Sequence, residues 1–194
     1  MEYKRTKIGQ FMFNITNKGS LFFARHKVLF YISTYTWGLL FTLIGWVMYG
    51  FVAIFLRKKI VEKGKFFTAR YMIFGNNWGG LEAGPNFLIA DKMGEDYTLH
   101  TKCHELGHTY QNALWGPFTI FMISIPSVVR YWYQRIRDLK GKPNKPYDAI
   151  FFEKSASYIG ETLLSEQKNK DYYYYTEDFK KNPNYGLPLQ KEEK

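Results

Sequence analysis

The distribution of apolar and polar positions along the chain is dominated by one long apolar run. Residues 28–56 contain no charged side chain. A helix of this length, rising about 1.5 Å per residue, is longer than the roughly 30 Å hydrocarbon core of a bilayer. Arg57, Lys58 and Lys59 follow directly, where a cleavable signal peptide would carry a small-residue cleavage site. The pattern therefore predicts a single transmembrane helix over residues 28–56.

Two shorter apolar segments after this run have the length and composition of strands. Residues 66–74 are rich in aromatic and aliphatic side chains, and residues 81–90 form a second such segment, interrupted by Gly84 and Pro85. A proline within a strand favours the edge of a sheet, where it removes no ladder hydrogen bond. We therefore expect a short antiparallel sheet. Its edge strand either holds an extended peptide substrate or simply packs against the following helix.

Helical segments follow the strands. The pattern predicts one helix over residues 97–114, which ends before Gly116 and Pro117, and another over residues from about 148 to 167. Between them, the uncharged stretch 113–129 is at or below the minimum length for a membrane span. This stretch is either a buried helix, which we favour, or a re-entrant segment beside a bilayer. Together the elements predict a mainly helical α+β fold.

The net charge of +10 is distributed unevenly, and this bears on the partners. All of the excess lies in residues 1–70, whereas residues 71–194 carry equal numbers of acidic and basic side chains. Positive charge on both sides of one apolar run suits anionic lipid headgroups better than a groove for nucleic acid. We therefore expect membrane lipids, and no nucleic acid, as partners. The C-terminal flank of the run is the more basic one, which predicts a single-pass protein with its larger part on the cytoplasmic side.

The helix predicted over residues 97–114 contains candidate metal-binding and catalytic residues in the sequence His104-Glu105-Leu106-Gly107-His108. Two histidines four residues apart share one helix face, so both imidazoles can reach one metal ion. Glu105 lies one step around the helix, within reach of a water on that metal rather than of the metal itself. This arrangement is typical of zinc-dependent hydrolysis, with His104 and His108 as ligands and Glu105 as the general base.

A hydrolytic zinc ion takes three protein ligands, so the chain must provide a third. His100 lies on the same helix face, but about 12 Å of helix axis separates it from His108, too far for both to bind one ion. A pattern that adds a histidine six residues after the second one fails, because Gln111 and Leu114 stand where it needs glycine and histidine. Cys103 is the only cysteine, which excludes a multi-cysteine zinc cluster and an internal disulfide.

Glu153, on the last predicted helix, is the best candidate for the third ligand. Small residues follow it on the same helix face and would let another helix approach closely: Ala156, Ser157 and Gly160. Gly107 offers a similar small position on the helix of the histidines. Glu161 and Glu166 are rival candidates without such small neighbours.

The histidine motif, followed about 45 residues later by Glu153, resembles the gluzincin branch of zinc metallopeptidases, which combine a helix-borne HExxH with a glutamate on a following helix. The stretch 72–162, with the segments HELGHTYQN, RYWYQ and PYDAIFFEKSASYIG, is similar to poorly characterised membrane-associated bacterial proteins of that kind. The resemblance implies a Zn2+ ion bound by His104, His108 and Glu153, with Glu105 as the base.

One position departs from the gluzincin pattern. Gluzincins often carry an acidic residue four positions after the ligand glutamate, where it orients a histidine, and this chain has Ser157 there. Asp148 is the alternative source of that support. The sequence does not single out the group that stabilises the oxyanion, for which the candidates are Tyr147, Tyr158, His100 and Arg130.

With this resemblance, the chain divides into four predicted segments: a basic N-terminal segment (1–27), the transmembrane helix (28–56), a small zincin-like metallopeptidase domain (57–167) and a polar C-terminal tail (168–194). The N-terminal segment is expected as a basic helix on the membrane surface or as an unstructured tail.

The predicted function is that of a membrane-anchored zinc metallopeptidase. It would hydrolyse peptide bonds of a protein or peptide substrate through a zinc-activated water, with Glu105 as general base. Two alternatives stay open: a non-proteolytic membrane adaptor with a structural or decayed zinc site, and a zinc hydrolase of a non-peptide membrane substrate. The sequence indicates no oligomeric state.

Overall fold

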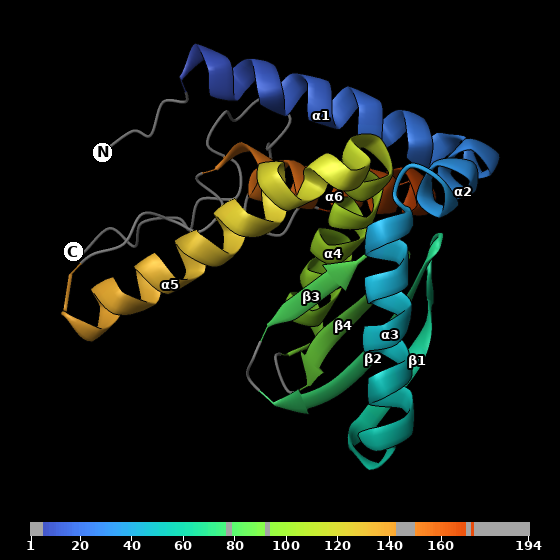
Figure 1. Cartoon of the computed structure of the whole chain (residues 1–194), viewed down its shortest axis with the longest axis vertical. Coiled ribbons are helices and arrows are strands. Elements are labelled where there is room, and N and C mark those ends of the chain that lie inside the picture. Colours follow the sequence, from blue (N-terminus) through green and yellow to red (C-terminus); the bar gives the residue numbers. More distant parts are fainter. Residues whose placement is uncertain (1–5, 77–78, 92–93, 143–149, 170–171, 173–194) are drawn as a thin grey trace.

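The chain folds into helices arranged around a small four-stranded sheet (Figure 1). The computed structural model describes residues 6–76, 79–91, 94–142, 150–169 and 172. The elements before the sheet are α1 (Lys7–Arg25), α2 (Lys27–Tyr35), α3 (Leu39–Phe55) and a 3₁₀ turn (Arg57–Lys59). The strands are β1 (Ile60–Phe66), β2 (Ala69–Asn76), β3 (Gly80–Ala83) and β4 (Asn86–Asp91). They are followed by α4 (Glu95–Trp115), a 3₁₀ turn (Gly116–Phe118), a π-helical turn (Ile120–Ser124), α5 (Ile125–Leu139) and α6 (Phe151–Lys168). The predicted mainly helical α+β class is confirmed.

The sheet is mixed, so the prediction of an antiparallel sheet is wrong for its central pair. The strand order is β1-β2-β4-β3, with β2 and β4 parallel and both outer pairs antiparallel. The predicted strand over residues 81–90 is in fact the hairpin of β3 and β4, which turns at Gly84 with a φ of 62°. Because the chain reverses both before β3 and after it, β4 runs in the direction of β2. The predicted edge position holds for β3, which forms one margin of the sheet.

Both faces of the sheet are covered, which explains why β2 and β4 are almost continuously apolar. Alternate side chains point to opposite sides, as the two-residue period of a strand requires. One side packs against α3 in a cluster formed by Val52, Met72 and Leu88, with Met48, Ile60 and Phe74 among its neighbours. The other side packs against α4 and α6 in a larger cluster that includes Tyr71, Ile73, Phe87, Ile89, Leu106, Tyr110 and Ile159. Helix α4 is therefore held between the sheet and α6.

Helices α4 and α6 approach each other closely because each presents a glycine to the backbone of the other. A Cβ atom on Gly107 of α4 would overlap the Ala156 carbonyl of α6, and one on Gly160 of α6 would overlap the Cys103 carbonyl of α4. The small face predicted after Glu153 is therefore the face that contacts α4. This close packing sets the distance between the side chains that the two helices project toward each other.

We expect the substitution Gly107→Ala to lower the free energy of unfolding by about 2 to 3 kcal/mol, because the added methyl group forces the backbone of α6 away. Gly50→Ala on α3 is the matched control. A Cβ at Gly50 meets nothing within 4 Å, so this change should be neutral or stabilise the helix by up to about 1 kcal/mol. Urea unfolding followed by circular dichroism measures both. Equal stability of Gly107→Ala and wild type would contradict the close approach.

The prediction of one continuous helix over residues 28–56 is wrong. The run forms α2 and α3, which are bent by 87° at residues 36–38. Uncharged polar groups hold the bend: the Ser33 hydroxyl and the Trp37 indole donate hydrogen bonds of 2.5 and 3.2 Å to carbonyls in the last turn of α4. Because Ser, Thr and Gly can interrupt a helix without introducing a charge, the absence of charged residues did not reveal this break.

Among the described residues, no single helix combines the length and the apolar composition needed to cross a membrane. In two cases, two consecutive helices meet that requirement when they are taken as a pair, but each pair is sharply bent. These pairs are α2 with α3, and Glu95–Phe118 with Ile120–Leu139, the latter bent by 115°. The second bend directs α5 away from the core. The favoured buried helix over residues 113–129 is therefore wrong, and several of its large apolar side chains are exposed: Phe118, Phe121, Ile125, Val128 and Val129.

The N-terminal segment is helical rather than an unstructured tail over residues 7–25. Helix α1 begins after Thr6, whose hydroxyl accepts a hydrogen bond of 3.1 Å from the Gly9 amide, and it packs against α4 and α6. Helix α6 ends at Lys168. Apart from residues 168, 169 and 172, the predicted C-terminal tail lies outside the described residues.

Candidate metal centre

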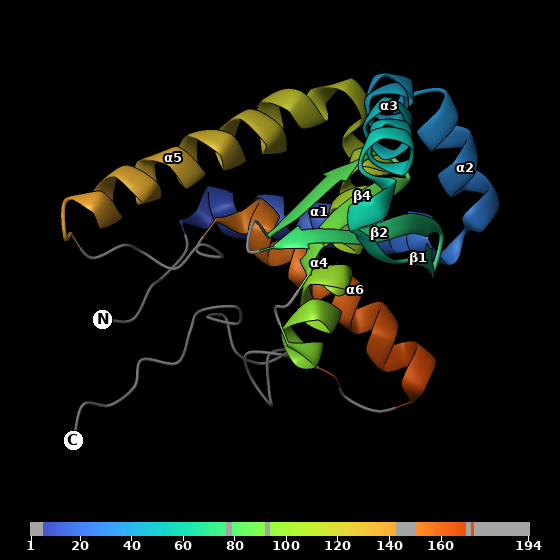
Figure 2. The ribbon, with the colours of Figure 1, turned by 90° about the horizontal axis from the view of Figure 1, so that it is seen from below.

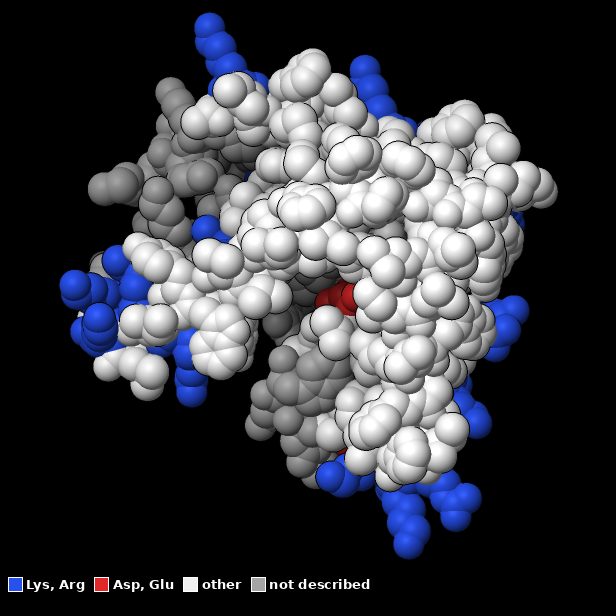
Figure 3. All heavy atoms as spheres, in the orientation of Figure 1, with Lys and Arg blue, Asp and Glu red and all other residues white. Residues whose placement is uncertain are grey.

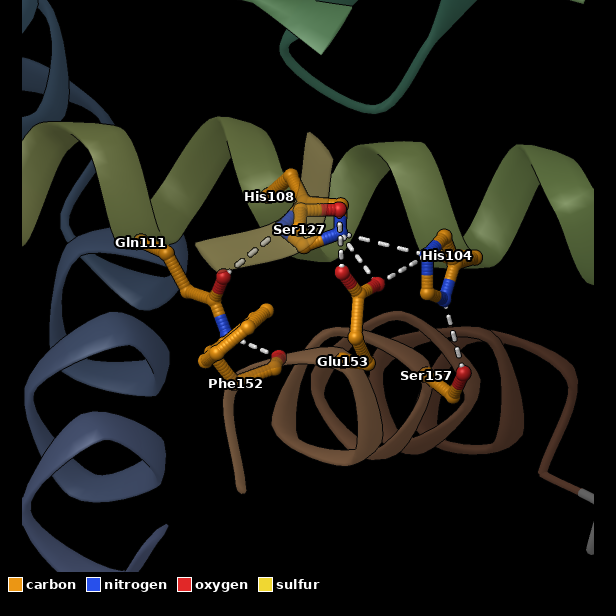
Figure 4. A network of polar contacts seen from close by, with 7 residues as sticks. All are labelled: His104, His108, Gln111, Ser127, Phe152, Glu153 and Ser157. Carbon is orange, nitrogen blue, oxygen red and sulfur yellow. Dashed lines mark hydrogen bonds and ion pairs between the residues drawn. The ribbon is translucent and has the colours of Figure 1, made fainter. Parts of the chain in front are cut away.

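Two histidines of α4 and one glutamate of α6 meet at the interface of these helices (Figure 4). The Nε2 atoms of His104 and His108 are 3.1 Å apart. The Oε2 atom of Glu153 lies 3.2 Å from the first and 3.3 Å from the second. The three atoms therefore form a nearly equilateral triangle. Glu153 follows His108 by 45 positions, so the triangle exists only because α6 packs against α4.

This triangle has the dimensions of three corners of a metal-binding tetrahedron. Zinc bonds to imidazole nitrogen and carboxylate oxygen are about 2.0 to 2.1 Å long, which places neighbouring ligand atoms about 3.3 Å apart. The observed separations of 3.1 to 3.3 Å fit that value without movement of either helix. The described residues thus include a largely buried group, His104, His108 and Glu153, that could hold a metal ion.

The hydrogen bonds of Gln111 set the protonation of His108. The Gln111 amide donates from Nε2 to the Phe152 carbonyl of α6 at 2.8 Å, so its Oε1 atom faces His108. That oxygen lies 2.8 Å from His108 Nδ1 and can only accept, so Nδ1 carries the proton. When the ring is neutral or binds a metal, Nε2 of His108 presents a lone pair toward the triangle, as a metal ligand must. Sequence reasoning used Gln111 only to exclude a histidine pattern and missed this role.

Two serines complete the outer contacts of the triangle. The Ser157 hydroxyl lies 2.9 Å from His104 Nδ1, at the position where gluzincins often have a carboxylate. Ser127 of α5 donates to Glu153 Oε1 at 2.6 Å, which leaves Oε2 for the histidines. The Ser157 hydroxyl therefore contacts the His104 nitrogen that faces away from the triangle. The alternative support from Asp148 lies outside the described residues, and Ser127 carried no signal in the sequence beyond its place after Pro126.

The charges of the three side chains depend on one another. Burial alone would lower the pKa of His108, but the hydrogen bond and the charge of Glu153 raise it to about 9, and the same bond raises the pKa of His104. Burial works against ionisation of Glu153 too, yet its hydrogen bonds to both histidines hold its pKa well below the usual range. The group therefore favours positive charge at its centre, which a cation supplies as well as protons do.

The rival ligands lie elsewhere. The Oε1 atom of Glu161 is 2.7 Å from His100 Nδ1 in a separate buried pair. Glu166 is on the surface, where Arg25 donates to it at 2.6 Å. Neither carboxylate approaches the histidine pair at 104 and 108.

A cavity of about 410 Å³ opens beside the triangle. Its walls come from β3, from α4, from the π-helical turn and from the first turns of α5, and Figure 3 shows the hollow with an acidic group at its base. Among its lining residues are His104, His108, Glu153 and Glu105. Glu105 is buried against Gly80 of β3, where any side chain would overlap its carboxylate. Burial raises the pKa of Glu105, while the two histidines oppose the rise.

Of the oxyanion candidates, His100 lines the cavity, and Tyr97 and Tyr131 join it there without having been singled out in the sequence. Tyr158 instead makes an edge-to-face contact with the Phe13 ring. Tyr147 lies outside the described residues. Arg130 is not among the residues that line the cavity.

Glu82 of β3 also lines the cavity and was missed from the sequence, because an isolated glutamate in a short strand carries no spacing signal. The Asn112 amide of α4 donates to its Oε1 atom at 3.3 Å. Burial raises the pKa of Glu82 to about 8, against the opposing charge of His108 and the bond from Asn112. A neutral carboxylic acid at this wall can donate a hydrogen bond into the cavity.

We expect the stability of Glu82→Gln relative to wild type to increase as pH rises. Between the ordinary pKa of 4.5 and about 8, the unfolded state releases the Glu82 proton and the folded state retains it, so folded wild type loses stability. Since Glu82 borders an open cavity, the gain should be about 1 kcal/mol. Thermal unfolding of both proteins in chelator from pH 5 to 8 measures the difference. A constant difference across that range would contradict the raised pKa.

Comparison of the chain with protein-family models, with curated protein sequences and with solved structures found no match. The gluzincin resemblance therefore rests on the motif residues, and the function has to be inferred from the geometry of the site.

Proposed function

We propose that the protein is a zinc-dependent hydrolase that cleaves peptide bonds. One observation carries the proposal: the triangle of His104, His108 and Glu153 borders an open cavity, with Glu105 in the wall beside it. Two imidazoles and one carboxylate are a ligand set that suits zinc, and three protein ligands leave a coordination position for water or substrate. A structural zinc site would instead be closed by a fourth protein ligand.

The residues of the chain have distinct roles in this proposal. Zinc, when bound, supplies Lewis acidity that polarises a carbonyl and lowers the pKa of water. His104, His108 and Glu153 hold it, and their partners Ser157, Gln111 and Ser127 keep the donor atoms pointed inward. Glu105 takes a proton from the attacking water and delivers it to the leaving amine, so the carboxylate returns to its starting state.

Strand β3 supplies a surface for an extended substrate. It forms one edge of the sheet and pairs only with β4 among the described strands. Gly80 and Leu81 of this strand, and Gly79 just before it, line the cavity next to Glu105. A peptide that pairs with the free edge would therefore pass along the wall of the cavity, with its main chain fixed by hydrogen bonds.

Two other functions make different predictions. An adaptor with a structural or decayed site would not hydrolyse any substrate, and the open cavity beside the triangle is an argument against it. A hydrolase of a non-peptide ester or amide would use the same metal and the same base, so only the substrate separates it from a peptidase.

The test is a cleavage assay with the purified full-length protein, a mixed-sequence peptide library and a parallel panel of phospholipids and esters. We expect peptide cleavage that stops when a chelator removes the metal and returns on addition of one equivalent of zinc. Cleavage of lipids or esters alone would favour the non-peptide hydrolase. Cleavage that persists in the chelator would overturn the metal-dependent mechanism.

A further inference from the structure

Helix α3 is apolar on all sides, and one of its apolar faces is left uncovered. Its exposed side chains lie on one side of the helix and form a single stripe: Leu39, Leu40, Leu43, Ile44, Trp46, Val47, Phe51, Ile54 and Phe55. Its buried positions are Phe41, Thr42, Gly45 and Val52. A surface helix of a globular protein normally carries polar residues on the side away from the core, so an uncovered apolar side is unusual for a helix in water.

Helix α5 repeats this arrangement. None of its residues is buried, and its exposed stripe is Ile125, Val128, Val129, Trp132, Ile136 and Leu139. Apart from Pro126, the half-buried positions are polar, namely Ser127, Arg130, Gln134 and Arg137. An amphipathic helix with a free apolar face and a basic polar face is typical of segments that lie in a membrane interface.

The two stripes belong to one surface. Figure 2 shows α3 and α5 along the same side of the molecule, and Figure 3 looks onto that side. The centre of this surface is almost free of charge, and Lys and Arg side chains gather around its margin (Figure 3). Exposed basic residues directly after α3 and toward the end of α5 contribute to that margin: Arg57, Lys58, Lys59, Arg135 and Lys140. We call the two stripes together the α3/α5 face.

The cavity opens on this face. One side of its mouth is the exposed Leu81 of β3, and the other is formed by Val128 and Tyr131 of α5, both exposed. The rim of the cavity is therefore apolar, while its floor carries the histidines and carboxylates. Figure 3 shows the acidic floor through an opening in the uncharged centre of the face.

We propose that the α3/α5 face docks on a bilayer that contains anionic lipids, and that the cavity receives polypeptide at the membrane surface. The apolar stripes would enter the acyl boundary and the basic margin would contact the headgroups. Charge favours lipid over a protein partner here, because basic side chains surround an uncharged apolar centre formed by two helices. The membrane docking stands independently of catalysis, whereas the substrate class rests on the proposed function.

Docking is tested with the full-length protein and sucrose-loaded vesicles of phosphatidylcholine, with or without phosphatidylglycerol. We expect sedimentation with the anionic vesicles, weakened several-fold in neutral ones. The double substitution Val47→Glu and Val129→Glu, one on each stripe, should weaken binding at least about 100-fold, since it places two charges at the acyl boundary. Wild-type binding by this variant would overturn the proposal.

Val61→Glu is the matched control. Val61 is 65% exposed, against 73% for Val47 and 62% for Val129, but it lies near α4 on the side of the sheet opposite α3. It should bind vesicles like wild type. If instead the face is covered by a second copy of the chain, wild type will be a dimer without lipid, the double variant a monomer, and vesicle binding absent; that result would overturn docking on lipid.

The substrate class is tested separately with one peptide offered free and anchored to anionic vesicles by a lipid tail. We expect wild type to cleave the anchored form faster by at least about tenfold, and the Val47→Glu, Val129→Glu protein to lose this preference but to cleave the free form like wild type. Equal cleavage of both forms by wild type would overturn the substrate class. Absence of all cleavage, with vesicle binding intact, would overturn the proposed function and leave the docking in place.

Discussion

Replacing Glu105 with glutamine should reduce the rate of peptide cleavage by about 100- to 10,000-fold while the protein still binds one metal ion. Glutamine has nearly the shape of glutamate and would occupy the same space against Gly80, but its amide cannot accept a proton from water. The ligands His104, His108 and Glu153 are untouched by this change. Initial rates and metal content of the same preparation, measured side by side, check both halves of the expectation.

Glu95→Gln is the control for this experiment, because Glu95 is exposed in the first turn of the same helix. It should leave cleavage and metal content as in wild type. A Glu105→Gln protein that cleaves at the wild-type rate would show that Glu105 is not the base. Loss of the metal together with activity would instead give Glu105 a role in holding the site.

Removing a ligand should have the larger effect on the metal. We expect His104→Ala and Glu153→Ala to lower zinc affinity by more than about 100-fold, because loss of an outer hydrogen-bond partner alone costs about 10- to 100-fold. Titration with zinc against a competing chelator measures the affinity, and elemental analysis of untreated protein identifies the metal. Iron in place of zinc would contradict the assignment of zinc, since two histidines and a carboxylate also bind Fe(II) in oxygenases.

Glu166→Ala serves as the control on α6, where Glu166 forms a surface ion pair with Arg25. Its zinc affinity should equal that of wild type. The unfolding temperature of each variant, with and without zinc, separates loss of the ligand from loss of the fold: wild type and Glu166→Ala should gain stability from zinc, and the ligand variants should not. Wild-type zinc affinity in Glu153→Ala would remove Glu153 from the ligand set.

Helix periodicity and side-chain size were sufficient to predict the three residues of the triangle, His104, His108 and Glu153. The spacing of His104 and His108 places both on one face of any helix, whatever surrounds it. Glu153 could be selected because small neighbours allow a close helix contact, and Gly107 and Gly160 do make that contact in the structure. These inferences needed only helix geometry and side-chain size.

The remaining features depend on contacts between distant parts of the chain. Gln111, Ser127 and Glu82 reach the site from three different elements, and no spacing in the sequence relates them to the histidines. The parallel pairing of β2 with β4 follows from a reversal at Gly84 that reads equally well as an interruption within one strand. The apolar run 28–56 looked like a membrane span, because composition alone does not distinguish a straight helix from two helices joined at a sharp bend.

The Gln111 amide makes His108 a spectroscopic reporter of the spacing between α4 and α6. The amide is fixed at one end by the Phe152 carbonyl and at the other by the His108 ring, so it bridges the two helices. While the bridge is intact, the imidazole of His108 keeps a proton on Nδ1, whether the ring is charged or neutral. If the helices separate, the amide is free to rotate and the charge of Glu153 moves away, so the ring becomes neutral more readily and can carry its proton on either nitrogen. The ¹⁵N chemical shifts of the two ring nitrogens in this one histidine would therefore record the integrity of the helix interface without any substrate.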